Sequence, residues 1–206
     1  MINPFDLSAV EYDNWYEKNE IIYQSEIEAL QKAIPHEGKG IEIGAGTGRF
    51  TNSFKINIGV EPSKNMSSIA EQIGVTIINA VAENLPIQDQ TFDFALMVTT
   101  VCFLNSISQA FSEVYRILKP HGKIILGIID KNSALGKIYE KEKSENKFFK
   151  NAHFYSTEEI TKQLTKIGFI DFSYWQTLTK SEEDKIEIPK QGFGDGGFVV
   201  IKAVKN

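Results

Sequence analysis

Short apolar runs alternate with amphipathic stretches along most of the chain. The apolar runs have the length of β-strands and occupy residues 40–44, 56–60, 75–78, 92–99, 123–129, 169–179 and 198–204. The run at 92–99 is almost continuously apolar, as expected for a central strand that is covered on both faces. Alternation of strand-length runs with helical stretches is typical of a parallel sheet flanked by helices.

The amphipathic stretches carry recognisable helix signals. Apolar residues recur at helical spacing over 23–34 and 107–118, and Ser156 with Glu159 has the spacing of a capping box. The last two apolar runs have no helix pattern between them, only a glycine-rich connection, so we expect them to pair antiparallel. The pattern predicts one doubly wound, Rossmann-like α/β domain with seven strands, mostly parallel, and an antiparallel C-terminal hairpin strand.

Composition and charge narrow the class of protein. With 206 residues, 42% of them hydrophobic, the chain is long enough for one domain and short for two. A net charge of −5 argues against nucleic acid as a partner, because that binding depends on lysine and arginine. Cys102 is the single cysteine, the N-terminus has no apolar signal core, and no apolar run is long enough to cross a bilayer. We therefore expect a cytoplasmic protein that binds neither nucleic acid nor a membrane.

The most informative segment follows the first apolar run and reads EIGAGTG over residues 42–48. Glycines there let the backbone turn sharply and let a ligand come close. In an open α/β sheet the ligand lies beyond the carboxyl ends of the strands, which is where this turn falls. Glu61 ends the second run, where a carboxylate can accept both hydroxyl hydrogens of a ribose. These residues predict a ligand that contains a ribose.

The glycine spacing separates two classes of cofactor. The dinucleotide fingerprint G-x-G-x-x-G needs a small residue at position 49, but Arg49 stands there and the third glycine comes early, at Gly48. Glu42 would repel a pyrophosphate at the helix N-terminus, whereas a zwitterionic or cationic ligand tolerates it. The pattern favours such a ligand, and an NAD(P)-dependent oxidoreductase stays open as an alternative.

Several ordered motifs together resemble the class I S-adenosylmethionine-dependent methyltransferases, in their small single-domain type-11 branch, over roughly residues 12–205. Residues 42–48 are similar to the family's first motif, whose loop wraps the methionine part of the cofactor. Residues 82–86, AENLP, resemble its adenine-edge loop, and residues 118–122, LKPHG, resemble the turn before its fifth strand. The resemblance implies the strand order 3-2-1-4-5-7-6 and S-adenosylmethionine as cofactor, with S-adenosylhomocysteine as its product.

The resemblance also implies roles for single residues. Glu61 matches the acid that holds the ribose, Met66 falls where the family packs the adenine, and Tyr12 resembles an aromatic lid, although it also fits an ordinary core. Val81 stands where the family often has an aspartate, so adenine recognition is expected to fall on backbone groups near Ala82. The implied cofactor-binding residues are Tyr12, Glu42, Gly44, Ala45, Gly46, Gly48, Glu61, Pro62, Met66, Ala82, Glu83 and Thr99.

The implied reaction is methyl transfer to a small-molecule acceptor by in-line displacement. In the family, the segment after the fifth strand commonly builds the acceptor pocket. His153 and Tyr155 lie in that segment and are the candidate catalytic side chains; a partly buried loop histidine is the alternative for His153. The three histidines lack partners at metal-ligand spacing, so we expect no metal.

We expect one methyltransferase domain over residues 1–206, with 1–36 as an N-terminal helical segment or lid and 130–155 as an insertion that forms the acceptor pocket. Little chain remains beyond the sheet and its helices, so the acceptor is expected to be small. A non-catalytic S-adenosylmethionine-binding protein on the same fold is a further alternative, since a fold does not fix a function. The sequence predicts neither the acceptor's identity nor the oligomeric state.

Overall fold

A central sheet of eight strands in the order β3-β2-β1-β4-β5-β8-β6-β7 organises the protein. The structure, a computed structural model, describes residues 4–179 and 185–206. The strands are β1 Gly40–Ile43, β2 Ile58–Val60, β3 Thr76–Ile78, β4 Phe92–Val98, β5 Leu118–Ile129, β6 Phe169–Thr177, β7 Lys190–Gln191 and β8 Phe198–Lys205. The first five strands pair parallel, and β8 runs antiparallel to both β5 and β6.

The predicted strand order is found, with one addition at the edge. The predicted sixth and seventh strands are β6 and β8, and β8 lies between β5 and β6 as expected. The extra strand, β7, is two residues long and pairs with β6. Gly192 follows β7 with a φ of +94° and continues the pairing, because its N–H donates to Tyr174 O at 2.9 Å. No apolar run or alternation in the sequence predicts so short a strand.

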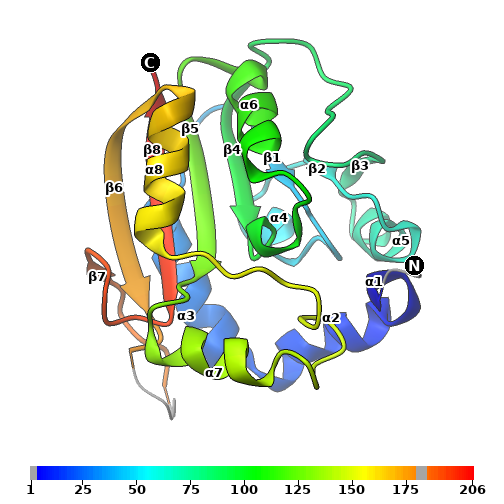
Figure 1. Cartoon of the computed structure of the whole chain (residues 1–206). Coiled ribbons are helices and arrows are strands. Elements are labelled where there is room, and N and C mark those ends of the chain that lie inside the picture. Colours follow the sequence, from blue (N-terminus) through cyan, green and yellow to red (C-terminus); the bar gives the residue numbers. More distant parts are fainter. Residues whose placement is uncertain (1–3, 180–184) are drawn as a thin grey trace.

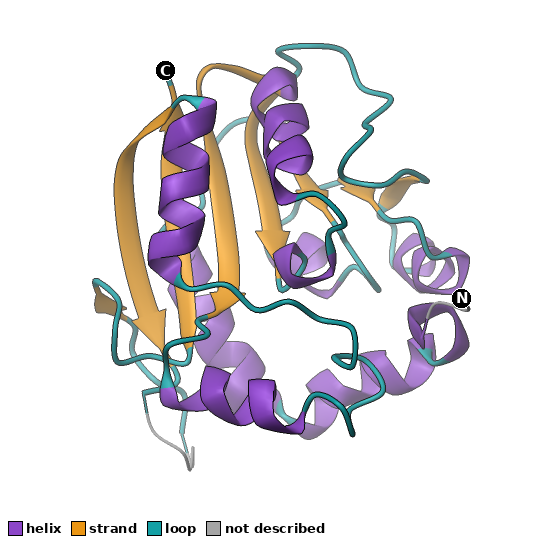
Figure 2. Ribbon diagram, in the orientation of Figure 1, coloured by secondary structure: helices purple, strands orange, loops and turns teal. Residues whose placement is uncertain are grey.

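Helices cover both faces of the sheet (Figure 2). Their bounds are α1 Pro4–Leu7, α2 Ala9–Lys18, α3 Glu20–Gln31, α4 Arg49–Ser53, α5 Lys64–Gln72, α6 Ile107–Ile117, α7 Ala134–Glu142 and α8 Thr157–Ile167, with a 3-10 turn η1 at Val101–Phe103. Side chains of α6 and α8 pack into one apolar core, and those of α3 and α4 pack into a second core on the opposite face. The predicted capping box of Ser156 and Glu159 begins α8.

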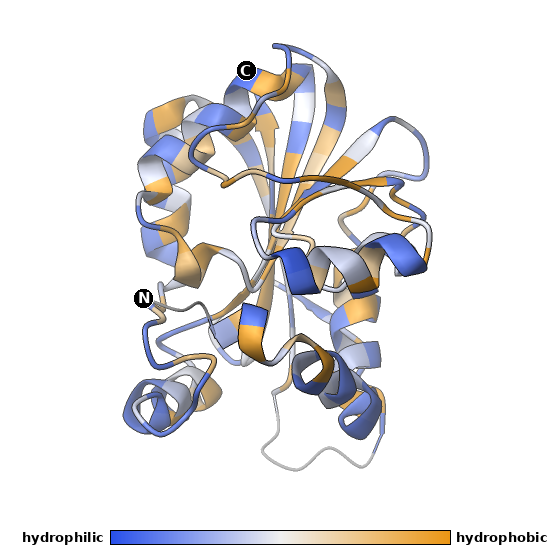
Figure 3. Cartoon of the chain, turned by 90° about the vertical axis from the view of Figure 1, so that its right-hand side faces the viewer, coloured by the Kyte–Doolittle hydropathy of each residue, from blue (hydrophilic) through white to orange (hydrophobic). Residues whose placement is uncertain are grey.

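The apolar residues are concentrated in the strands, and the outer sides of the helices are polar (Figure 3). In β4 every residue except Asp93 is buried, which agrees with the predicted central position. Strand β5 begins at Leu118, earlier than predicted, because Leu118 pairs with Phe92 and β5 then bulges out before Lys123 pairs with Phe94. His121, in that early part, has a φ of +61°, a backbone conformation that favours glycine.

Two segments that are far apart in the sequence border the sheet where its parallel strands end. The arrowheads of β4 and β5 point toward the edge along which α2 and α7 lie (Figure 1). Helices α1 to α3 fall within the predicted segment 1–36, of which residues 1–3 lie outside the described residues, and α7 falls within 130–155. None of the helices in the described parts of the chain has the length and apolar character that crossing a bilayer requires. This edge is where the sheet's turns bring the predicted ligand-binding residues.

Candidate active site

A cavity of about 600 Å³ lies beyond the carboxyl ends of β1, β2 and β4. The strand order brings the residues that follow these strands to one place: Gly44 after β1, Glu61 after β2 and Thr99 after β4. Ten residues singled out from the sequence lie in its wall: Tyr12, Gly44, Gly46, Glu61, Pro62, Met66, Ala82, Glu83, Thr99 and His153. Glu42, Ala45, Gly48 and Tyr155 are not among the residues that line it.

Two glycines of the turn after β1 are required for different reasons. Gly44 has a φ of +76°, and a Cβ built on it would stand 2.4 Å from side-chain atoms of Thr100. Gly46 has a φ of +56°, but a Cβ there would meet nothing closer than the Met66 Cε, at 3.8 Å. Gly44 therefore allows close packing of the turn on β4, whereas Gly46 keeps the wall of the cavity free for a ligand.

Glu61 presents a buried carboxylate to the cavity. Only 8% of the residue is exposed, and its carboxylate accepts hydrogen bonds from the backbone N–H groups of Gly46 and Ser63, each at 2.9 Å. Burial raises the pKa of this carboxyl above its ordinary value, while the two backbone donors counteract the rise. Each oxygen has two lone pairs and uses one, so the group fits a ligand that offers two hydroxyls, such as a ribose.

Glu42 lies beneath the glycine turn rather than in the cavity wall. It is 1% exposed, and the Thr51 hydroxyl donates to its carboxylate. Burial raises the pKa of Glu42 to about 8. Ala45 and Gly48 are also buried in the turn, and the Cβ of Ala45 packs against Gly59 of β2. These three residues stabilise the turn and do not line the cavity, so any effect on a bound ligand would act through the turn.

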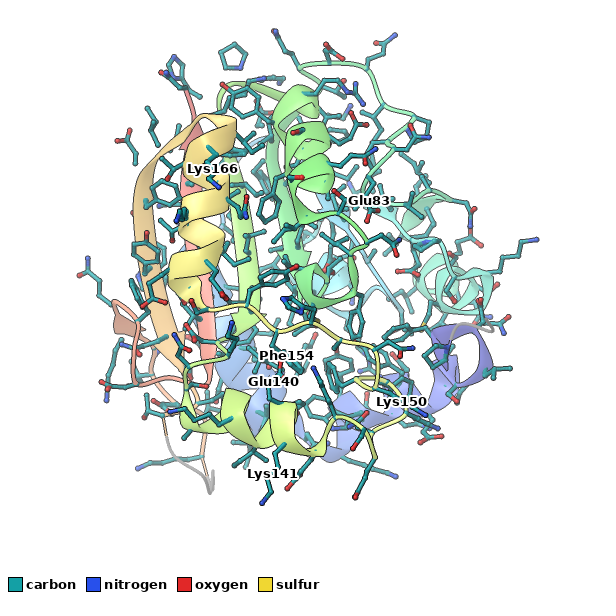
Figure 4. All side chains as sticks on the ribbon, viewed as in Figure 1. Glu83, Glu140, Lys141, Lys150, Phe154 and Lys166 are labelled. Carbon is teal, nitrogen blue, oxygen red and sulfur yellow. The ribbon has the colours of Figure 1, made fainter. Side chains whose placement is uncertain are left out.

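The wall on the β2 side is apolar and suits a flat base. Val60, Ala80, Val81 and Ala82 line it together with Met66. Glu83, labelled in Figure 4, lies between this wall and α6. Its carboxylate accepts from the backbone N–H groups of Asn105 and Ser106, at 2.8 and 3.2 Å, and thereby holds the loop before α6 in place.

Another part of the cavity wall, hereafter the aromatic end, consists of aromatic rings. Phe5 packs edge-on against Tyr12 and Phe103, with ring centroids 5.5 and 5.0 Å apart, and stacks on Phe148 at 5.6 Å. The four rings come from three segments that are far apart in the sequence: α1 with α2, η1, and the residues after α7. All four line the cavity. Lys141 of α7 points away from the sheet, whereas Phe154 is buried (Figure 4).

The two candidate catalytic side chains are adjacent but face different spaces. The rings of His153 and Tyr155 meet edge to face, with centroids 4.5 Å apart. His153 lines the large cavity, and its backbone N–H donates to Cys102 O at 2.8 Å. Tyr155 lines a void of about 10 Å³ behind it, together with Thr99 and Cys102. Burial raises the pKa values of the Tyr155 hydroxyl and of the Cys102 thiol, the latter to about 12, so both groups are neutral near pH 7.

The sequence did not identify several of the residues that line the cavity. Phe5, Phe103, Phe148 and Asn151 belong to no motif, and each comes from a segment whose position depends on the tertiary fold. Only the density of aromatic residues at 148–155 gave a signal, and it did not reveal which rings would face the cavity. Cys102, the single cysteine, also lines the cavity.

Comparison with known proteins gives a consistent answer. Residues 41–126 match the model of a family described as "Methyltransferase domain". A crystal structure from Thermotoga maritima, described as an S-adenosylmethionine-dependent methyltransferase and possible histamine N-methyltransferase, is 49% identical to this chain. It superposes with a TM-score of 0.95 and 98% of each chain covered.

Two further relatives extend the comparison. An uncharacterized protein of Methanocaldococcus jannaschii is 48% identical over 99% of this chain and 100% of its own length. A phosphoethanolamine N-methyltransferase of Haemonchus contortus, in complex with phosphomonomethylethanolamine and S-adenosylhomocysteine, shares the fold. It has a TM-score of 0.63 at 18% identity, over 87% of this chain and 52% of its own.

The cavity fits the cofactor of these relatives, because it combines an open glycine turn, a buried carboxylate for two hydroxyls and an apolar wall for a base. The methyltransferase prediction is confirmed over the oxidoreductase and the non-catalytic binder. The chain belongs to the class I S-adenosylmethionine-dependent methyltransferases, and S-adenosylmethionine is its cofactor.

Proposed function

We propose that the protein transfers a methyl group to a small acceptor that carries no negative charge and binds against the aromatic end of the cavity. The observation that carries this proposal is the distribution of charge. Of the described residues that line the cavity, Glu61 and Glu83 are the charged ones, and no lysine or arginine is among them. A carboxylate or phosphate on the acceptor would have no lysine or arginine in the cavity wall to pair with, which is strongly unfavourable for a buried anion. Lys147, whose Nζ lies 5.1 Å from the Phe148 ring centroid, is already paired with Glu11.

The residues of the cavity divide between the two substrates. Glu61 holds the ribose hydroxyls, the glycine turn lets the methionine part of the cofactor come close, and Met66 and Ala82 pack the adenine. The acceptor then lies among Phe5, Phe103 and Phe148, which exclude water and hold it in one orientation. Alignment of this kind contributes about 7–11 kcal/mol to many two-substrate reactions.

The bound cofactor supplies a methyl group that its positive sulfur already activates. The acceptor's lone pair forms the new bond to the methyl carbon as the carbon–sulfur bond breaks, and that electron pair stays on sulfur. In this proposal His153 takes the proton that the acceptor loses, because its side chain lines the cavity and an imidazole is the most frequent general base. Tyr155 packs edge-on against the His153 ring and limits its orientation.

A nitrogen nucleophile on a flat ring fits these requirements. The relative from Thermotoga is described as a possible histamine N-methyltransferase, and histamine is a heteroaromatic amine without a negative charge. Aromatic walls bind such rings, and also their cationic forms, through stacking and cation–π contacts. The shortness of the segments at this end, 130–155 and α1–α2, limits the acceptor to a small molecule.

Radiolabelled methyl transfer from S-adenosylmethionine to a matched panel of acceptors tests the proposal. The panel contains histamine and benzylamine beside benzoate and phenyl phosphate, which have similar rings but carry negative charge. We expect product only from the amines, and about a hundredfold less of it with the His153→Gln variant. Turnover confined to the anionic acceptors, or absent with every member of the panel, would contradict the proposal.

A further inference from the structure

Arg49 binds a helix that is distant in sequence. Its guanidinium contacts both carboxylate oxygens of Asp13, with Nε–Oδ1 and Nη2–Oδ2 distances of 2.7 Å, and its Nη1 lies 2.5 Å from Glu17 Oε1. The Thr47 hydroxyl donates to the same Asp13 Oδ1 at 2.6 Å. A two-point contact between planar groups fixes orientation as well as distance, which a lysine in place of arginine would not do.

Both partners of Asp13 belong to the turn that faces the cofactor. Thr47 lies between the last two glycines of the turn, and Arg49 is the first residue of α4. Tyr12, one residue before Asp13, lies over the turn: its Cε1 is 4.0 Å from the Cβ position of Gly46. The ion pair therefore holds the Tyr12 ring against the open side of the glycine turn.

The same helical segment, residues 4–18 (hereafter the lid), makes a second polar contact near the ribose site. The Ser63 hydroxyl donates to Asp6 Oδ1 at 2.6 Å, and Ser63 also donates its backbone N–H to Glu61. On its other side the lid supplies Phe5 to the aromatic end. The lid is thus a wall for both substrates, and carboxylates attach it to the rest of the domain.

The ion pair is partly shielded from water. The side chains of Arg49 and Asp13 are 25% and 21% exposed. Burial alone would disfavour the charge of Asp13, yet the hydrogen bonds from Arg49 and Thr47 hold its pKa below the ordinary value. Asp13 is therefore ionised at neutral pH, and the contact persists under working conditions.

We propose that Asp13 and Arg49 are positioning residues: they fasten the lid to the glycine turn and thereby retain the bound cofactor. They do not touch the reacting atoms and act through Tyr12. The proposal goes beyond the proposed function and is independent of the acceptor, because it concerns the rate at which the cofactor leaves the cavity. A lid that is fastened less firmly opens more often, so release is faster while entry is not slowed.

The test measures association and dissociation rates of S-adenosylhomocysteine by stopped-flow displacement. We expect Asp13→Asn and Arg49→Gln each to raise the dissociation rate about tenfold, with an unchanged or faster association rate. The double variant should raise it by less than the product of the two single rises, because both changes break the same Asp13–Arg49 contact. Arg49→Lys, which keeps the charge but not the fork, should give a smaller rise.

Asp93→Asn is the matched control, since the Asp93–Lys119 ion pair, at 2.8 Å, belongs to the opposite ends of the strands. It should leave both rate constants unchanged. Thr47→Val removes one hydrogen bond to Asp13 and should raise the dissociation rate about threefold. If an Arg49 variant fails to fold, Thr47→Val provides the measurement instead. Dissociation rates within twofold of the unmodified protein in the folded variants would overturn the proposal, as would an equal rise in the control.

Discussion

The two ends of the cavity are built in different ways. The cofactor end uses residues that directly follow parallel strands, and its carboxylate, Glu61, is held by two backbone N–H groups. The aromatic end, the proposed acceptor end, uses rings from α1, α2, η1 and the segment after α7, which touch one another mainly through aromatic contacts. Sheet topology therefore places Gly44, Glu61 and Thr99 at the first end, whereas the second depends on how three separate segments pack.

This difference explains how one fold serves many acceptors. Replacing a ring at the acceptor end changes the size of the pocket without disturbing the strands that carry the cofactor. A change at Gly44 or Glu61, in contrast, alters a position that the sheet itself constrains. Variants at one end should therefore change the binding or turnover of one substrate and leave the binding of the other almost unchanged.

The largest separation is expected at His153. His153→Gln removes the proposed proton acceptor and should lower the rate constant of methyl transfer about a hundredfold, within the range for general bases. The dissociation constant of S-adenosylhomocysteine, measured by calorimetry, should stay within twofold. His36→Gln, at an exposed position after α3, is the control and should change neither quantity. A large loss of cofactor affinity in His153→Gln would contradict the division of the cavity into two ends.

Glu61→Gln tests the other end. The amide keeps the shape of the side chain but removes the charge that accepts hydroxyl hydrogens, so affinity for S-adenosylhomocysteine should fall about thirtyfold, or roughly 2 kcal/mol. Calorimetric titration measures this, with the exposed Glu71→Gln as control. Affinity equal to that of the unmodified protein would show that Glu61 does not hold the ribose.

The glycine turn allows a comparison within the cofactor end. Gly44→Ala places a Cβ 2.4 Å from Thr100 and should lower the free energy of unfolding by about 2 kcal/mol or more, measured by urea denaturation. Gly46→Ala should cost only about 1 kcal/mol, because nothing crowds its Cβ, but should weaken cofactor binding. The opposite order of stabilities would contradict the packing described here.

The smallest expected effect concerns Glu42. The carboxyl of the unfolded chain ionises near its ordinary pKa of 4.5, whereas burial raises the pKa in the folded protein to about 8. Between these values the folded state binds a proton that the unfolded state does not, so stability falls as the pH rises from 4.5 to 8. Glu42→Gln has no carboxyl to ionise and therefore lacks this loss. The free energy of unfolding of Glu42→Gln minus that of the unmodified protein should increase by at least about 1 kcal/mol from pH 4.5 to 8. A difference that is constant with pH would show that Glu42 ionises normally.

The sequence predicted the fold and the cofactor end because both depend on local patterns. Apolar runs marked the principal strands, and the glycine turn with Glu61 identified the ligand edge. The two-residue β7 was missed because it is too short to show an alternating pattern and its two residues are polar. Arg49 was interpreted only as an obstacle to dinucleotide packing, since its partner Asp13 lies 36 residues away on another helix.

Side-chain direction limited the prediction of the site. Glu42 and Gly44 are two residues apart, yet the first faces Thr51 and the second the cavity. Likewise, Tyr155 and His153 share a segment but line different spaces. Phe5 and Phe148 meet only because the lid and the segment after α7 cross the same edge of the sheet. Such long-range contacts leave no trace in local spacing.

A crystal structure of the protein with S-adenosylhomocysteine tests the central claim, the division of the cavity into two ends, most directly. We expect both ribose hydroxyls within hydrogen-bond distance of the Glu61 carboxylate and the Asp13–Arg49 ion pair intact. It also predicts that the space bounded by Phe5, Phe103 and Phe148 stays free for an acceptor. A ribose that avoids Glu61, or a ligand that fills the aromatic end with its adenine, would contradict it.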